Sequence, residues 1–470
     1  MPLVAGVDSS TGSTKVEVRD ADTGALVARG SAPHPATTPP RSEQDPAAWF
    51  AAFEAAWQQA GAPTVAAVSV AGQQHGMVAL DADAQVIRPA KLWNDTETAP
   101  DAGWLLEQLP GRAADWATAC GSVPVAAFTI TKLSWLHRSE PHAWARLAHV
   151  VLPHDWLTYR LTGHLVTDRG DASGTGYWSA ATGEYRFDLL AIVDPNRDWS
   201  TVVPPVLGPL EPAGTWGDVA VACGTGDNMA AALGSGLQPG DVAISLGTSG
   251  TAYTVSATPT ADATGAVAGF ADATGRYLPL VCTLNATKVT DAIGRLVGAD
   301  HAELGALALA GAPGAGGVVL LPYLDGERTP DRPTATGVLA GLRSDVERGQ
   351  LARAAFEGVL CGLLDGVDAL GRVCSVGDGR LVLVGGGSRS TAYRQLLADL
   401  SGLAVHVPDA TEHVAAGACV QAAALLHERD PEDVAAAWGL GAGRTVEPAL
   451  SPDAAEAVRT AYAARRDTEA

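Results

Sequence analysis

Cysteine is scarce in this 470-residue sequence, with six in the whole chain and none in a Cys-x-x-Cys pair. A chain of this length can bury a full core without disulfide bonds, so the wide spacing favours free thiols in a reducing, cytoplasmic setting. The histidines also lack the spacing of a zinc site. The first residues have no basic segment of the kind that begins a secretory signal, and we expect no signal peptide.

Basic residues are few as well. The 31 Lys and Arg stand against 52 Asp and Glu, which gives a net charge of −21. This balance argues against a nucleic-acid partner, and it means that an anionic substrate must be held by local dipoles, a metal or a few cations. One uncharged stretch about as long as a membrane span, residues 304–324, contains five Gly and two Pro. We therefore expect a loop that enters a buried strand at 318–321, and no membrane segment.

Two turns rich in Gly, Ser and Thr occupy matching places in the two halves of the chain. Residues 9–14 join an apolar strand at 3–8 to an alternating strand at 15–19, and residues 247–250 join strands at 241–246 and 251–256. Backbone N–H groups and hydroxyls in such turns can bind phosphate without a formal charge. An ordinary hairpin pair is the alternative. The glycine run at 385–387 has neither dinucleotide-binding nor P-loop spacing, but it could lie against an adenine or ribose.

Two acids are candidates for chemistry. Asp8 ends a buried strand beside the first turn, where a carboxylate can face Mg²⁺ near a phosphate or can simply cap the turn. Asp227, in Gly-Thr-Gly-Asp-Asn, could accept the proton of a hydroxyl that attacks a phosphate. The alternatives are an ordinary turn Asp and the N-cap of a helix over 228–233.

A glycine-bracketed polar loop, residues 72–76, follows the strand expected at 66–71. Ligands bind at such strand ends in α/β sheets, so His75 could contact a polyhydroxylated ligand, or it could be an ordinary satisfied histidine. Residues 92–95 are read as a second strand edge and 168–176 as a turn-rich stretch of unassigned role. After Asp430 we expect a peripheral helix and a frayed tail. The other predicted elements are helices at 45–60, 350–370, 393–400 and 414–426 and a strand at 381–384.

Together these residues resemble the FGGY carbohydrate kinases, over nearly the whole chain to about residue 430. Residues 6–15 resemble the family's first phosphate loop, residues 245–250 its second phosphate loop, and residues 385–387 its adenosine loop. Residues 128–136 resemble one of the family's signature sequences, and residues 337–342 together with 351–357 resemble the other. The resemblance implies an α/β fold of two actin-like (ribonuclease H-like) domains with a deep interdomain cleft. It implies a sugar-binding domain over 1–236 and an ATP-binding domain over 237–470.

The resemblance also implies roles for single residues. Asp227 would be the proton acceptor, Asp8 the acid near Mg²⁺, and Gln74, His75 and Asn228 would contact the sugar with Asp227. The remaining residues implied to contact ATP are Thr11, Ser13, Lys15, Gly247, Thr248, Ser249, Gly385 and Gly386.

Within the family, residues 71–76, 92–95 and 321–330 are similar to xylulokinases. This implies ATP-dependent phosphorylation of a ketopentose, D-xylulose to D-xylulose 5-phosphate, in the cytoplasm, with a homodimer allowed but not required. Two departures put the sugar preference in question: Glu97 stands where many relatives have Arg, and Gly12 where many have Gln. The alternatives are a kinase for a pentitol, ribulose, gluconate or glycerol, and a nucleotide-binding sensor of the same fold without phosphoryl transfer.

Overall fold

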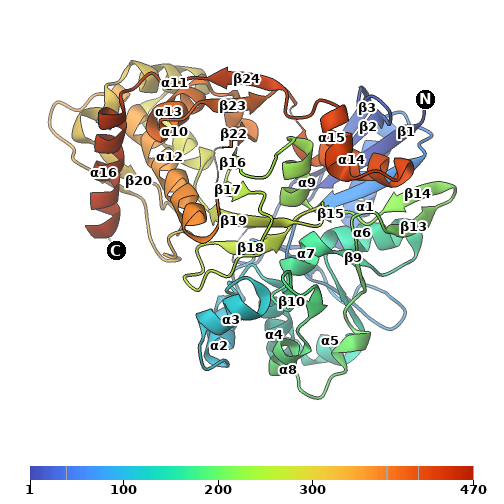
Figure 1. Ribbon diagram of the computed structural model, residues 1–470. Coiled ribbons are helices and arrows are strands. Elements are labelled where there is room, and N and C mark those ends of the chain that lie inside the picture. Colours follow the sequence, from blue (N-terminus) through green and yellow to red (C-terminus); the bar gives the residue numbers. More distant parts are fainter. Residues whose placement is uncertain (39, 377–378, 411, 469–470) are drawn as a thin grey trace. The chain divides into compact units, whose positions relative to one another are not determined.

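The computed structural model describes residues 1–38, 40–376, 379–410 and 412–468, which fold into two compact units (Figure 1). Unit 1 comprises Met1–Gly236, Ala257–Leu278 and Glu412–Gly441, and unit 2 comprises Leu237–Ser256, Pro279–Thr411 and Ala442–Ala470. Each unit contains helices around a central mixed sheet. The α/β fold expected from the sequence is therefore confirmed, and neither unit is continuous along the chain.

The sheet of unit 1 has the order β13-β14-β5-β1-β2-β3, with the short strand β15 also paired to β5. Strand β1 pairs antiparallel with β2 and parallel with β5. The polar first hairpin and the strand before the 72–76 loop lie where the sequence predicted them. The strands are β1 (Leu3–Ser9), β2 (Ser13–Asp20), β3 (Leu26–Pro33), β5 (Ala67–Gly72), β13 (Pro212–Trp216), β14 (Val219–Ala222) and β15 (Thr225–Gly226).

Helices cover both faces of this sheet. On one face α1 (Pro46–Gln59) and α6 (Pro153–Thr162) bury an apolar cluster that includes Trp49 and Trp156. On the other face α14 (His413–His427) packs against β1, β5 and α9 (Asp227–Gly234). The prediction for α1 is confirmed at its start, because the Asp45 carboxylate accepts a hydrogen bond from the Ala47 N–H and Pro46 opens the helix.

Shorter elements complete unit 1. Its other helices are α2 (Ala99–Glu107), α3 (Ala113–Cys120), α4 (Thr129–Ser139), α5 (Pro141–Arg146), α7 (Arg169–Ser173), α8 (Phe187–Val193), α15 (Pro431–Ala437) and the 3₁₀ turn η1 (Trp199–Thr201). Its other strands are β4 (Glu43–Gln44), β6 (Val78–Leu80), β7 (Ala90–Lys91), β8 (His149–Val151), β9 (Thr167–Asp168), β10 (Trp178–Ser179), β11 (Glu184–Tyr185), β12 (Val206–Leu207) and β18 (Ala268–Ala271). The strand edge predicted at Leu92–Asp95 is wrong, because β7 ends at Lys91 and a turn follows.

The sheet of unit 2 runs in the order β19-β17-β16-β22-β23-β24. Strand β16 pairs antiparallel with β17 and parallel with β22, which repeats the arrangement of β1 with β2 and β5. The strands are β16 (Val242–Leu246), β17 (Gly250–Thr254), β19 (Tyr277–Thr283), β20 (Val319–Leu321), β21 (Val338–Ala340), β22 (Leu381–Val384), β23 (Val405–Pro408) and β24 (Gly443–Val446). The helical elements are α10 (Thr287–Val297), α11 (His301–Ala310), η2 (Pro313–Gly317), α12 (Arg348–Val373), η3 (Gly386–Arg389), α13 (Thr391–Ser401) and α16 (Pro452–Thr468).

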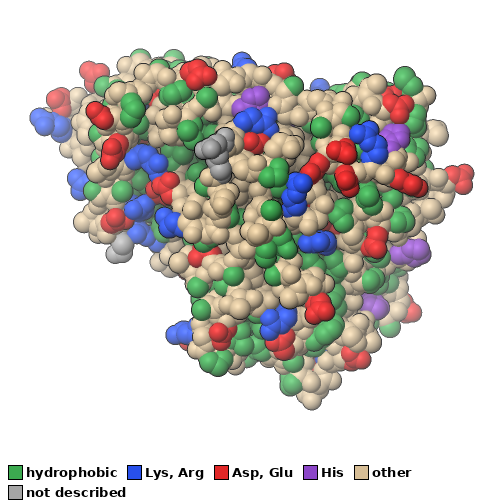
Figure 2. All heavy atoms as spheres, viewed as in Figure 1, with side chains coloured by type: hydrophobic (Ala, Val, Ile, Leu, Met, Phe, Trp, Pro, Cys, Tyr) green, Lys and Arg blue, Asp and Glu red, His purple; other side chains and the backbone are tan. Residues whose placement is uncertain are grey.

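Two expectations in unit 2 are corrected. The uncharged stretch 304–324 enters a buried strand, β20, as expected, but it begins as helix α11 rather than as loop. After Asp430 the expected helix is present as α15, but the expected frayed tail is wrong, since residues 443–446 add β24 to the sheet edge beside β23 and residues 452–468 form α16. Across the described residues, no helix combines the length and the apolar character that crossing a bilayer requires. On the face shown in Figure 2, acidic and basic side chains are interspersed.

Candidate active site

Three neighbouring strand ends of unit 1 carry the candidate residues. In the parallel pairing of β1 with β5, Asp8 lies beside Ala71, and in the pairing of β15 with β5, Gly226 lies beside Gly72. Adjacent strands are about 4.8 Å apart. Asp8, the 73–75 loop and Asp227 are therefore gathered at one edge of the sheet, at the carboxyl ends of β1, β5 and β15.

Asp227, Asn228 and Gln74 form one hydrogen-bonded group. The Asn228 side-chain amide donates to Asp227 Oδ1 and to Gln74 Oε1, both at 3.0 Å. Gly226 holds the N-cap position of α9 and Asp227 is the first helical residue, so the N-cap alternative for Asp227 is wrong. The structure thus brings together three of the residues predicted to contact a sugar.

The surroundings of Asp227 make its carboxylate a stronger base than usual. Burial, followed by the negative charges of Asp8 and Asp171, raises the pKa of Asp227 to about 8. A group with a pKa near the working pH can take up a proton and release it again. This is the property required of a proton acceptor for an alcohol.

Asp8 is buried at the end of β1 and has two neighbours of opposite kinds. Its Oδ1 accepts a hydrogen bond from the Ser10 hydroxyl, and its Oδ2 lies 3.5 Å from Lys15 Nζ. Lys15 also pairs with Glu412 at 2.7 Å. Burial raises the pKa of Asp8, and Lys15 opposes that shift. A buried carboxylate with a single shared cation can accommodate a further positive charge.

The side chains of the 9–14 turn already form hydrogen bonds within unit 1, which the sequence did not indicate. Thr11 Oγ1 accepts from the Trp93 ring N–H at 2.8 Å and donates to Gln73 Oε1 at 3.3 Å. Ser13 begins β2. At Gly12 an added Cβ would meet no atom within 4 Å, so a larger side chain fits there without displacing the turn.

His75 is buried and held from two sides. Its Nδ1 lies 2.7 Å from the Gly174 carbonyl oxygen, and its ring packs against Phe128 and Phe270 at centroid distances of 4.9 and 5.5 Å. Its backbone is left-handed, with φ of 65°. The sharp turn between Gln74 and Gly76 thus fixes the ring, whose contact with sugar stays a prediction.

Glu97 forms ion pairs with two basic residues of its own unit. It lies 2.7 Å from the buried Lys91 and 3.0 Å from Arg41, and these partners lower its pKa to about 2. Lys91 also pairs with Asp95 at 2.9 Å. Glu97 is therefore an acid that balances a buried lysine.

In unit 2 the two glycine loops lie against each other. Gly385 and Gly387 each approach Leu246, the last residue of β16, so closely that an added Cβ would come within 2.7 Å of it. The Thr287 N–H, at the start of α10, donates to the Gly247 carbonyl at 3.0 Å. At Gly386 an added Cβ would meet no atom within 4 Å. The 247–249 and 385–387 loops and one helix start thus share a strand-end edge.

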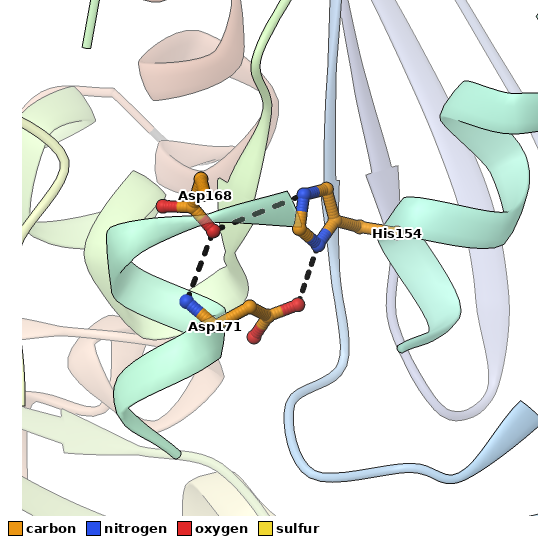
Figure 3. A group of neighbouring side chains, drawn as sticks. All are labelled: His154, Asp168 and Asp171. Carbon is orange, nitrogen blue, oxygen red and sulfur yellow. Dashed lines mark hydrogen bonds and ion pairs between the residues drawn. The ribbon is translucent and has the colours of Figure 1, made fainter. Parts of the chain in front are cut away.

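Sequence reasoning left the 168–176 stretch unassigned, and the structure places it beneath the site. Asp168, the N-cap of α7, and Asp171, within α7, face the two ring nitrogens of His154, on α6 (Figure 3). All three side chains are buried. The available signal was a His-Asp pair, residues 154 and 155, directly after an apolar run.

Comparisons with known proteins agree over almost the entire chain. Models of the N-terminal and C-terminal domains of the FGGY family of carbohydrate kinases match residues 3–234 and 242–426. A xylulose kinase of Streptomyces rubiginosus is 49% identical, covering 95% of this chain and 92% of that protein. One from Haemophilus influenzae is 34% identical, covering 89% and 90%. The crystal structure of a xylulose kinase from Bifidobacterium adolescentis superposes with a TM-score of 0.86, at 42% identity and 99% coverage of both chains.

Proposed function

The chain belongs to the FGGY family of carbohydrate kinases, and from this premise we propose that it transfers the γ-phosphoryl group of ATP to the 5-hydroxyl of D-xylulose. The observation that carries the proposal is Asp227, a carboxylate of raised pKa bonded to Asn228 at a strand-end edge. Support for the sugar comes from relatives named xylulose kinase at 49% and 42% identity.

Asp227 is the proposed proton acceptor. As the sugar oxygen forms its bond to the γ-phosphorus, the hydroxyl proton passes to the Asp227 carboxylate, and the bond from γ-phosphorus to the bridging oxygen of ADP breaks. Phosphoryl transfer proceeds largely by positioning and charge stabilisation. Asn228 and Gln74 hold the carboxylate and a substrate hydroxyl in place, and His75 closes the sugar site from the side of Phe128.

The loops are assigned to ATP in the same proposal. The backbone N–H groups and hydroxyls of Gly247, Thr248 and Ser249 would bind phosphate, and the open face at Gly385 and Gly386 would accept the adenosine. On unit 1, Ser13, Lys15 and the Thr11 turn are the phosphate-binding candidates. Lys15 already neutralises Asp8 and Glu412, so it would have to exchange those partners.

Mg²⁺ is the metal expected with ATP, and Asp8 fits it. Hard oxygen ligands of a buried carboxylate suit this ion, usually through bound water. The ion would neutralise phosphate charge, while Asp8 would fix its position. The proposed setting is the cytoplasm, where the six cysteines, all free thiols, would stay reduced.

Turnover on a sugar panel tests the function. Wild type, Asp227→Asn and the control Asp218→Asn, an exposed acid in the β13–β14 turn, are assayed for ADP release with D-xylulose, D-ribulose, xylitol, gluconate and glycerol. D-Xylulose should give the highest kcat/KM. Asp227→Asn should lower kcat by at least about 10²–10⁴-fold, with the control unchanged.

Three results would each contradict a part of the proposal. Near-normal kcat in Asp227→Asn would remove the base. ATP binding by the wild type without turnover on any acceptor would instead favour a nucleotide sensor, and preference for another acceptor would reassign the sugar.

A further inference from the structure

The first turn of α7 and its N-cap residue bring two carboxylates to one histidine close to the candidate active site. His154 Nδ1 lies 2.5 Å from Asp171 Oδ2, and Nε2 lies 3.8 Å from Asp168 Oδ1 (Figure 3). A third carboxylate, Asp155, lies 3.3 Å from Nδ1. Although burial disfavours the charged ring, these acids raise the pKa of His154 to about 10. Both ring nitrogens thus face oxygen acceptors, an arrangement that favours the protonated ring.

His154 itself supplies the cation of this cluster. A metal ion would sit about 2 Å from each of its ligands and would hold a histidine nitrogen and a carboxylate oxygen about 3 Å apart or more. The 2.5 Å separation of His154 Nδ1 from Asp171 Oδ2 is instead a direct, charge-assisted hydrogen bond.

The carboxylates of Asp168 and Asp171 differ in how many hydrogen bonds they accept. Asp168 Oδ2 accepts from the Gly170 N–H and the Thr225 hydroxyl, and Oδ1 accepts from the Asp171 N–H. Asp171 uses only Oδ2. Among the described residues, its buried Oδ1 has no hydrogen-bond partner. Both oxygens of Asp168 thus accept hydrogen bonds within the fold, whereas Asp171 has one oxygen that accepts none from the described residues.

In the part of the chain that the structure describes, Gln74, on the neighbouring loop, has an unpaired hydrogen-bond donor. Gln74 accepts from Asn228 through Oε1, but its buried Nε2 finds no hydrogen-bond partner within the described part of the chain. Both groups converge on Gly226, since a Cβ there would stand 2.8 Å from Gln74 Cδ and 2.9 Å from Asp171 Oδ1. Gly226 directly precedes Asp227.

An unpaired buried donor and an unpaired buried acceptor are each costly, and a hydroxyl can satisfy both at once. Building on the function proposed above, we propose that Asp171 is a sugar-binding residue: one hydroxyl of the sugar, other than the reacting one, donates to Asp171 Oδ1 and accepts from Gln74 Nε2. His154 is the positioning residue, because its bond to Oδ2 leaves Oδ1 directed at Gly226.

The test pairs a variant with substrates that lack single hydroxyls. Wild type and Asp171→Asn are assayed with D-xylulose and with its 1-, 3- and 4-deoxy analogues. Asp171→Asn should raise KM for D-xylulose by about 10- to 100-fold, the range for a bond to a charged acceptor, with KM for ATP unchanged. With wild type, one deoxy analogue should have a KM raised by the same factor relative to D-xylulose. With Asp171→Asn, the same analogue and D-xylulose should have equal KM values.

Asp168→Asn is the matched control, because the same charge is removed from the residue whose oxygens are all engaged within the fold. Any loss in that variant should be equal for every sugar. An Asp171→Asn loss that is likewise equal for every sugar would overturn the proposal.

A crystal of the wild type with D-xylulose provides a second readout if Asp171→Asn does not fold. A sugar hydroxyl should lie within about 3.2 Å of Asp171 Oδ1, and a water there with the sugar more than 4 Å away would overturn the proposal. Failure of the proposed function looks different: the wild type would turn over none of these sugars.

Discussion

At the scale of single residues, Asp227 is surrounded by charge of its own sign. Asp8 stands on one side of β5, Asp227 follows β15 on the other, and Asp171 lies below. Such an arrangement raises the pKa of Asp227, on which its proposed role as a base depends. It does so at the expense of stability, because the folded state resists ionising a group that is ionised readily in the unfolded chain.

The pH dependence of stability should reveal the cost of the raised pKa of Asp227. The pKa of Asp227 is about 8 in the folded protein and near 3.8 in the unfolded chain, so between these values the folded state holds the extra proton. Stability should therefore fall as pH rises from about 4 to about 8, by at most roughly 1.4 kcal/mol per pH unit from this group. Asp227→Asn removes the contribution. Its Tm advantage over wild type should grow between pH 5 and pH 8, and an advantage independent of pH would contradict the assigned pKa.

At the scale of elements, the position of α9 depends on two glycines at its contact with α14. An added Cβ at Gly417 would overlap the Ala230 carbonyl oxygen, and one at Gly234 would overlap the His413 carbonyl oxygen. Neither obstacle is a flexible side chain. The helices can approach this closely only because both positions lack a side chain, and α9 carries Asp227 at its first residue.

Gly417→Ala should therefore displace α9. We expect a loss of about 1–3 kcal/mol in unfolding free energy together with at least a tenfold drop in kcat, measured by denaturant unfolding and ADP release. Gly103→Ala, the same change on the exposed side of α2 where nothing lies within 4 Å, should instead stabilise by about 0.5–1 kcal/mol. Equal effects of the two substitutions would contradict this account of the α9–α14 contact.

Elements with local signals were predictable, and those fixed by distant contacts were not. Helix α1 follows from Asp45, Pro46 and the spacing of its aromatic residues, all within one segment. Helix α7 did not, because its first turn depends on Asp168, which both caps the helix and accepts from Thr225 in another strand. The edge strand β24 is exposed and short, so its sequence carries little hydrophobic pattern.

In the candidate site, too, residues with a local sequence signal could be predicted and those that depend on distant contacts could not. Asp8, His75 and Asp227 could be singled out because each follows a strand pattern or sits in a glycine-rich turn. Asp171 could not, since its significance lies in an unpaired oxygen and a histidine 17 positions away, and neither has a sequence signature.

At the scale of the whole molecule, the net charge of −21 opposes the approach of one substrate and not the other. ATP is an anion and the sugar is neutral. Mobile ions shorten the reach of the protein's field from about 30 Å at 0.01 M to about 8 Å at 0.15 M salt.

Raising NaCl over that range should therefore increase kcat/KM for ATP while leaving kcat/KM for D-xylulose at saturating ATP unchanged. Initial rates with each substrate varied in turn provide the measurement. A fall in kcat/KM for ATP over the same range would show that local cations outweigh the global field.

The helix that covers the second face of the unit 1 sheet has a bearing on biosynthesis. Helix α14 comes from residues 413–427, while the strands it covers are finished by residue 226. A ribosome adding about 5–20 residues per second releases α14 some ten seconds or more after those strands. During that interval the nascent chain exposes Gly6, Ser69 and Ala71 to its surroundings, so a chaperone would have its longest opportunity to bind on the face against which α9, with Asp227, later packs.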